Sequence, residues 1–198
     1  MRRTATALLF FFLATAANPA YSDLTTQGII ARMFSAYAHA DAYSDSGSVD
    51  SGESWLSMAW HLIRRGRAYD EFRTMYVRGR TLRFVYSSTD GRNAQADRDS
   101  DLIALAGSSH GASTAVPFLL LNNNDAPLRR LNGWKRSADT TVRGARCFTV
   151  SGTLNGGGVH ATYTLHIDRR TYFLTRITRE MSAGDAVWRE TIDYLRVK

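Results

Sequence analysis

The 198-residue sequence contains a single cysteine, Cys147, and only two lysines among its 25 basic residues. One cysteine cannot form a disulfide within the chain, and a small strand side chain is its expected role. The basic residues are spread along the chain with no run longer than two, unlike a nucleic-acid-binding patch. We therefore expect neither a disulfide scaffold nor a nucleic-acid partner.

Recognisable settings for catalysis or metal binding are also missing. Ser108, Ser109 and His110 lie in a predicted Gly/Ser loop, whereas a nucleophile elbow needs a strand-to-helix turn. His160 and His166 are six residues apart on one predicted strand, about 20 Å, which is too far to share a metal ion. There is no glycine-rich loop before a helix that could hold a phosphate. The sequence predicts a protein that is not an enzyme and has no metal or cofactor.

Residues 1–20 have the features of a secretory signal peptide. Arg2 and Arg3 form a positively charged start, an apolar run from residue 7 to residue 13 follows, and small residues come next. The apolar run is shorter than the roughly 20 residues of a membrane-spanning helix. Small residues around Ala16 and up to Ala20 offer two cleavage positions. We expect residues 21–198 to form one exported domain that is soluble after cleavage of the signal peptide.

Hydrophobic periodicity predicts one amphipathic helix over residues 23–41. Asp23 or Thr25 can cap its start. The apolar stripe either closes the core only or also lines a ligand space under a concave sheet. Its members, at helical spacing, are Ile30, Met33, Phe34 and Tyr37.

The middle of the chain mixes clear strand patterns with an ambiguous segment. Residues 55–67 fit either a short helix or a strand, and residues 92–101 are polar and indicate an exposed loop. Residues 70–86 form two alternating runs around a turn at residues 78–80, and Asp90-Gly91 indicates a further reversal. We expect the large residues of this hairpin to form one hydrophobic wall: Phe72, Tyr76, Leu82, Phe84 and Tyr86.

Four alternating runs follow one another from residue 143 to residue 198. Glycine- and aspartate-containing turns at residues 155–158, 168–170 and 183–185 separate them, which predicts an antiparallel meander with one apolar face. Asp168 is expected to bond the backbone near Thr171 and so stabilise its own turn. Candidate lining residues from this part of the chain are Trp134, Phe148, Tyr163, Leu165, Trp188 and Tyr194.

Several of these segments resemble the LolA/LolB-like periplasmic lipoprotein carriers. Residues 142–148 resemble the glycine turn and following strand of that superfamily, and residues 165–177 resemble its strand–turn–strand. Residues 42–49 and 72–86 resemble its first strand and its basic hairpin. The resemblance implies that short helices near residues 102–106 and 116–121 cover the concave sheet as a lid, with Leu102, Leu105, Val116, Phe118 and Leu119 as lining residues.

These observations predict an α+β fold: a curved antiparallel sheet, or half-barrel, with an N-terminal helix and short lid helices over its concave face. The resemblance implies non-catalytic, reversible binding of an acyl chain or lipidated protein in the periplasm, as in outer-membrane lipoprotein sorting. Its expected partners are lipid or lipoprotein acyl chains and envelope membrane proteins, and we expect a monomer. A second hypothesis is a sensor or protein-interaction module on the same fold, with a cavity filled by its own side chains.

Overall fold

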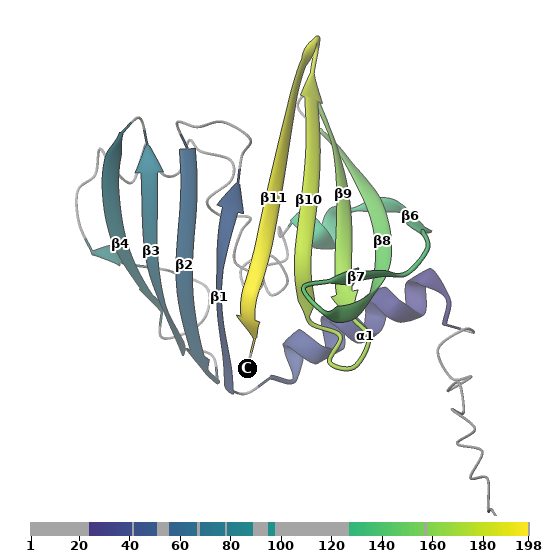
Figure 1. Ribbon diagram of the computed structural model, residues 1–198, viewed down its shortest axis with the longest axis horizontal. Coiled ribbons are helices and arrows are strands. Elements are labelled where there is room, and N and C mark those ends of the chain that lie inside the picture. Colours follow the sequence, from purple (N-terminus) through teal and green to yellow (C-terminus); the bar gives the residue numbers. More distant parts are fainter. Residues whose placement is uncertain are drawn as a thin grey trace, which may run out of the picture.

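One curved antiparallel sheet and one helix make up the part of the chain described by the computed structural model (Figure 1). Ten strands follow the order β5-β4-β3-β2-β1-β11-β10-β9-β8-β6, and the eleventh, β7, lies off this path and pairs with β8. The sheet does not close into a barrel. The described residues are 24–40, 42–50, 56–66, 68–77, 79–88, 95–97, 127–156 and 158–197.

The sheet has two parts that meet where β1 pairs with β11. We call the first part the wing; it consists of β1 (Ala42–Asp50), β2 (Leu56–Arg65), β3 (Ala68–Val77), β4 (Arg80–Ser88) and β5 (Gln95–Asp97). We call the second part the half-barrel; it consists of β6 (Asn132–Arg136), β7 (Thr140–Val142), β8 (Ala145–Gly156), β9 (Val159–Asp168), β10 (Leu174–Ala183) and β11 (Ala186–Val197). A short 3-10 helix, η3 (Pro127–Arg130), precedes β6.

The predicted N-terminal helix is α1 (Thr26–Ala38). Thr25 caps it: the backbone there is extended, and its hydroxyl accepts a 3.1 Å hydrogen bond from the Gly28 amide. Ile30, Met33 and Tyr37 of the predicted stripe are buried, and so is Ile29, which the stripe did not include. No helix in the described ranges combines the length and apolar character needed to cross a membrane.

The predicted meander is confirmed as β8 to β11, each strand pairing with the next. Asp168 stabilises the β9–β10 turn as expected, because its Oδ1 accepts 2.8 Å hydrogen bonds from the Arg170 and Thr171 amides. The ambiguous segment 55–67 contains strand β2, and part of the predicted 92–101 loop forms edge strand β5. The expected lid helices at residues 102–106 and 116–121 lie outside the described residues.

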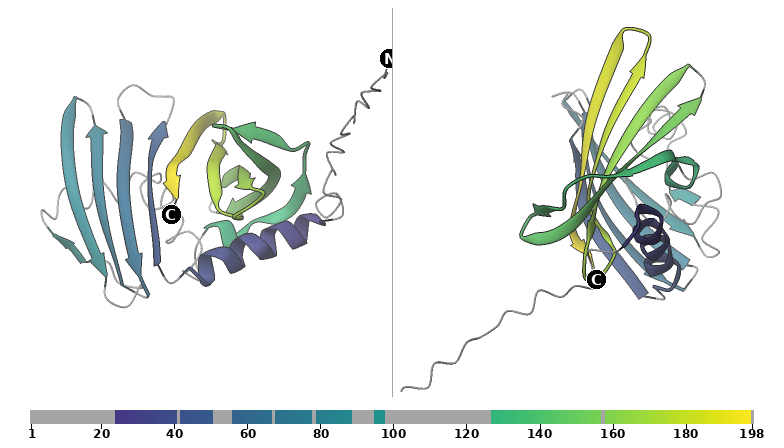
Figure 2. Two further views of the ribbon diagram at one scale, coloured as in Figure 1. Left: turned by 60° about the horizontal axis from the view of Figure 1, so that its bottom comes forward. Right: turned by 90° about the vertical axis from the view of Figure 1, so that its right-hand side faces the viewer.

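The position of α1 distinguishes the two parts of the sheet. Figure 2 shows the helix crossing the concave side of β8 to β11, while the wing lies beside it. Its buried side chains join those of the half-barrel in one hydrophobic cluster, to which Leu128 and Leu131 around η3 also belong. The helix therefore fills the core of the half-barrel.

Candidate functional site

An apolar row runs across the concave face of the sheet through eight consecutive strands. Its half-barrel members are all fully buried. The strand registers align Val150, Leu165, Ile177 and Ile192 on β8 to β11 with positions Val49, Met58, Met75 and Leu82 on β1 to β4. The register of this row therefore continues from the half-barrel into the wing with an apolar residue type at every position, whereas the neighbouring positions of the same alternation on β3 are Arg73 and Glu71.

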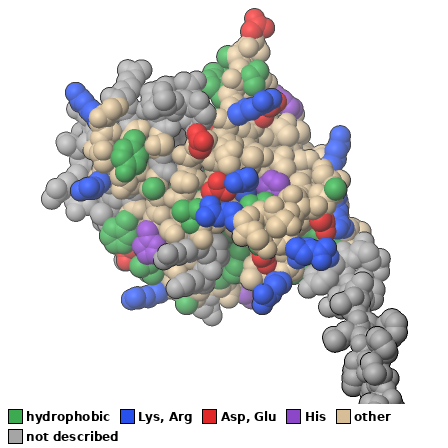
Figure 3. Space-filling model, in the orientation of Figure 1, with side chains coloured by type: hydrophobic (Ala, Val, Ile, Leu, Met, Phe, Trp, Pro, Cys, Tyr) green, Lys and Arg blue, Asp and Glu red, His purple; other side chains and the backbone are tan. Residues whose placement is uncertain are grey.

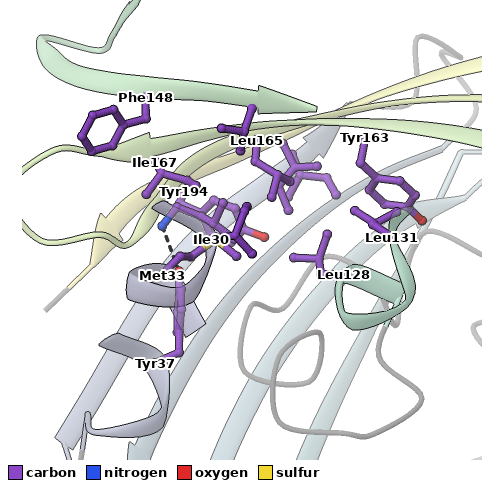
Figure 4. Packing of buried hydrophobic residues seen from close by; sticks show 14 of the residues in the cluster. Ile30, Met33, Tyr37, Leu128, Leu131, Phe148, Tyr163, Leu165, Ile167 and Tyr194 are labelled. Atoms are coloured by element: carbon purple, nitrogen blue, oxygen red, sulfur yellow. Dashed lines mark hydrogen bonds between the residues drawn. The ribbon is translucent and has the colours of Figure 1, made fainter. Parts of the chain in front are cut away.

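In the half-barrel this face is already covered by the chain itself. Phe148, Tyr163 and Leu165, three of the predicted lining residues, are 0–3% exposed and belong to the hydrophobic cluster with α1. Figure 4 shows Met33 and Ile30 of the helix and Leu128 of η3 directed toward these strands. The Tyr37 hydroxyl also accepts a 3.0 Å hydrogen bond from the Leu174 amide, which fixes the helix on the sheet.

The hairpin predicted over residues 70–86 is formed by β3 and β4 of the wing, which carry its predicted lining residues. Trp60 and Leu62 on β2 are buried on the concave side. The backbone of β4 pairs Leu82, Phe84 and Tyr86 with Met75, Arg73 and Glu71 of β3, the alternation that also contains Trp60 and Leu62, so two of these three β3 positions are charged residue types. The side chains of these three β4 residues lie outside the described part of the structure.

Phe72 and Tyr76 require a correction, because they lie on the other face of the sheet. They are 48% and 49% exposed, and Phe72 stacks on exposed His61 with ring centroids 6.4 Å apart. Their register partners on β4 are residues 85 and 81, the alternation opposite to that of Phe84. The prediction of a single hydrophobic wall that includes Phe72 and Tyr76 with Phe84 is therefore wrong.

The two predicted tryptophans lie on strands of the half-barrel, β6 and β11. Trp134 is half-buried against Gly152, where a β-carbon would approach the indole ring to 3.0 Å, so glycine permits this packing. Trp188 is 44% exposed near the tip of the β10–β11 hairpin, opposite Met181. The predicted lid residues are outside the described ranges: Leu102, Leu105, Val116, Phe118 and Leu119.

A buried carboxylate that sequence reasoning missed lies where the wing joins the half-barrel. Asp45 on β1 is 1% exposed and accepts hydrogen bonds from the Tyr43 hydroxyl at 2.7 Å and the Trp60 indole at 2.8 Å. Burial raises the pKa of Tyr43 and of Tyr194, whose ring meets Trp60 edge-on. Both phenols are therefore neutral at physiological pH, and the cluster fixes Trp60 on the concave face. The sequence signal for this buried carboxylate was an aspartate, Asp45, at a position that points inward in the alternation of β1.

A buried ion pair also lies on the concave face of the half-barrel. Arg179 on β10 is opposite Glu190 on β11, and the two form a salt bridge with side chains only 2% and 9% exposed. An amino group of Arg179 also donates to the Tyr163 hydroxyl at 3.4 Å. Charges buried in this way are tolerated because each is hydrogen-bonded to the other.

The described residues include side chains of the types that can bind a metal ion or act as a nucleophile. No cluster of three or more His, Cys, Asp or Glu side chains that could hold a metal ion occurs among them. Burial raises the pKa of the Cys147 thiol, which opposes formation of the nucleophilic thiolate. Burial and then the neighbouring Arg176 lower the pKa of His166. What these residues do form is a buried apolar cluster that reaches Trp60 and Leu62 on β2 and contains hydrogen-bonded polar groups.

A scan against protein-family models finds no match, and a search of curated proteins finds none. Among solved structures, a chain of the MucA/MucB complex of Pseudomonas aeruginosa matches over 87% of this chain and 56% of its own, with a TM-score of 0.52 and 13% identity. A structure of MucB matches over 87% of this chain and 58% of its own, with a TM-score of 0.52 and 11% identity. LprF of Mycobacterium bovis matches over 85% of this chain and 92% of its own, with a TM-score of 0.53 and 13% identity.

The chain has a LolA-like fold. The resemblance predicted from the sequence is thus confirmed for the architecture, and at these identities the likeness shows the fold alone. The chain spans less than two thirds of the length of the MucB chains it matches.

Proposed function

We propose that this protein is a non-catalytic binding protein of the cell envelope that shelters an acyl chain on the concave face of its wing. The acyl chain belongs to a lipid or a lipidated protein. The observation that carries the proposal is the apolar row, which continues four strands beyond the helix. Export of residues 21–198 to the periplasm is part of the proposal.

The dimensions of α1 support this assignment. Its 13 residues span about 20 Å at 1.5 Å per residue, which covers about four strands at 4.8 Å spacing. The row crosses eight strands, so the helix can fill only the half-barrel. An acyl chain on the wing would contribute about 0.8 kcal/mol per buried methylene, or about 12 kcal/mol for about fifteen of them as an upper limit.

The proposed contact residues follow from the register of the wing. Trp60 and Leu62 on β2 and positions Leu82, Phe84 and Tyr86 on β4 share one alternation. Asp45 bonds the Trp60 indole and holds that ring at the boundary with the filled half-barrel. The lid residues at 102–106 and 116–121 remain predicted contacts.

The test is mass spectrometry of an organic extract of the purified protein, with two matched variants. Phe84→Asp places a charge in the proposed site, whereas Phe72→Asp places the same charge on the neighbouring strand but on the convex face. We expect lipid at about one equivalent in the wild type and in Phe72→Asp, and loss of lipid in Phe84→Asp. Wild-type protein without lipid, or equal loss in both variants, would contradict the proposal.

A second function is supported by the convex face of the wing. Phe72 and Tyr76 are exposed there with stacked His61, and exposed aromatics favour a protein contact. The MucB structures with a similar fold include a complex with MucA. The same variants separate the two functions, because a protein-interaction module should lose its partner in Phe72→Asp and retain it in Phe84→Asp.

A further inference from the structure

Positive charge is concentrated at one end of the half-barrel. The segments 24–40, 127–146 and 168–172 carry nine basic and two acidic residues, a net charge of +7. The rest of residues 21–198 carries fourteen basic and sixteen acidic residues, a net charge of −2. We call these three segments the basic end. All of the excess positive charge that follows the predicted leader lies there.

Aromatic rings hold several of the arginines at this end. The guanidinium groups of Arg136 and Arg169 lie 5.3 and 5.2 Å from the centre of the buried Phe148 ring. Both also bond Asp139, with nitrogen–oxygen distances of 3.1 and 3.3 Å. A single carboxylate thus serves two guanidinium groups, and the cluster keeps a net positive charge.

The same arrangement extends onto α1. The Tyr172 ring stacks on Phe148, and Arg32 both lies over Tyr172 at 5.5 Å and donates a 2.9 Å hydrogen bond to its hydroxyl. Arg129 lies 4.9 Å from the centre of the Phe34 ring. The contact with an aromatic ring restricts each of these guanidinium groups before any ligand arrives, which reduces the entropy lost on binding.

The charges of the basic end reach the surface. Figure 3 shows Lys and Arg side chains along the lower right of the molecule, where α1, β7 and the β9–β10 turn lie in Figure 1. Asp168, the second acid, has Oδ1 occupied by the amides of its own turn. The exposed basic residues are Arg32, Arg129, Arg130, Lys135, Arg143, Arg146 and Arg170.

The chemistry of this surface suits a layer of phosphate groups better than a folded protein. Protein interfaces generally have an apolar centre. Of the five large hydrophobic residues that are exposed in the described structure, four lie on the wing or at the β10–β11 tip, and Leu195 alone lies beside the β7–β8 turn. A headgroup layer requires spread positive charge without an apolar centre, and guanidinium forks match phosphate oxygens.

We propose that the basic end docks the protein on the anionic phosphate headgroups of a membrane surface. The contact is peripheral: the exposed basic side chains, including Arg32 and Arg129 beside their aromatic rings, meet the phosphates, and no side chain needs to enter the hydrocarbon. This docking goes beyond acyl-chain binding and does not depend on it, because it uses charge on the half-barrel and not the wing.

The test is co-sedimentation with vesicles. The sample is the soluble protein obtained after the full-length chain is expressed. Vesicles of phosphatidylcholine are compared with vesicles that also contain phosphatidylglycerol, at low and at high salt. The variant Lys135→Gln/Arg146→Gln/Arg170→Gln removes three exposed charges of the basic end. The matched control, Arg65→Gln/Arg80→Gln/Arg83→Gln, removes three exposed charges of the wing.

We expect binding to the anionic vesicles only, and loss of binding at about 0.5 M salt because exposed charges are then screened. Each charge removed from the basic end should weaken the partition constant about fivefold, and about 100-fold for the triple variant. The wing control should change it less than about threefold. The proposal would be overturned if both variants had equal effects, or if the protein bound vesicles of phosphatidylcholine alone. It would also be overturned if the protein bound no vesicles, whether or not it bound polyglutamate. Thermal unfolding of both variants verifies that they remain folded.

Discussion

Replacing Glu190 by Gln tests how the buried ion pair contributes to folding. The amide keeps the shape of the side chain but removes the carboxylate charge that faces Arg179, in a site where both side chains are at least nine-tenths buried. The remaining guanidinium charge would then be poorly compensated in a region of low polarity. Loss of one member of such a pair costs about 3–5 kcal/mol, and we expect a decrease of that size in the free energy of unfolding.

Urea unfolding followed by tryptophan fluorescence measures this decrease, and Glu180→Gln is the matched control. Glu180 pairs with Arg189 across the same two strands, but these side chains are 51% and 80% exposed, so the loss should be about 0–1 kcal/mol. The double variant Arg179→Met/Glu190→Met should recover most of the stability. The reasoning fails if the two single variants agree within about 1 kcal/mol, or if the double variant is less stable than Glu190→Gln.

Two further predictions concern the junction between the wing and the half-barrel. A β-carbon at Gly47 would lie 2.2 Å from a backbone carbonyl oxygen of β11, so Gly47→Ala should lower the free energy of unfolding by about 3 kcal/mol. The control is Gly156→Ala, where the β-carbon would lie in open space. This change should alter the free energy of unfolding by less than about 0.5 kcal/mol. Urea titrations that give equal values would contradict this. Burial raises the pKa of Tyr37, Tyr43 and Tyr194, so the stability that depends on their neutral form is complete below pH of about 10 and is lost as the pH rises further. Their ionisation, measured at 295 nm, should coincide with unfolding; titration of all nine tyrosines near pH 10 in folded protein would refute it.

The half-barrel could be predicted from the sequence because its signals are local. Alternation with period two and turn residues at regular intervals are sufficient for β8 to β11, and an aspartate such as Asp168 stabilises its own turn whatever the rest of the chain does. The cap at Thr25 and the stripe of α1 are local in the same sense. These features were therefore predicted correctly.

The wing was harder to predict because its strands have large side chains on both faces. In β3, Phe72 and Tyr76 alternate with positions that include Met75, so period two establishes a strand but does not indicate which face is concave. Segment 55–67 was ambiguous because its apolar residues also fit helical spacing. Asp45, Arg179 and Glu190 were missed because burial of a charge depends on partners from other strands.

The stability of the Phe84→Asp variant can distinguish a carrier from a self-filled module. If the chain's own side chains cover the wing, position 84 is a core position, and a charge there should lower the free energy of unfolding by about 3 kcal/mol or more. If a lipid covers it, the lipid-free variant should be nearly as stable as lipid-free wild type, because the face is then exposed in both. Urea unfolding of delipidated wild type, Phe84→Asp and Phe72→Asp provides this comparison. A large loss confined to Phe84→Asp, in a protein that carries no lipid, would exclude the carrier and retain only the interaction module.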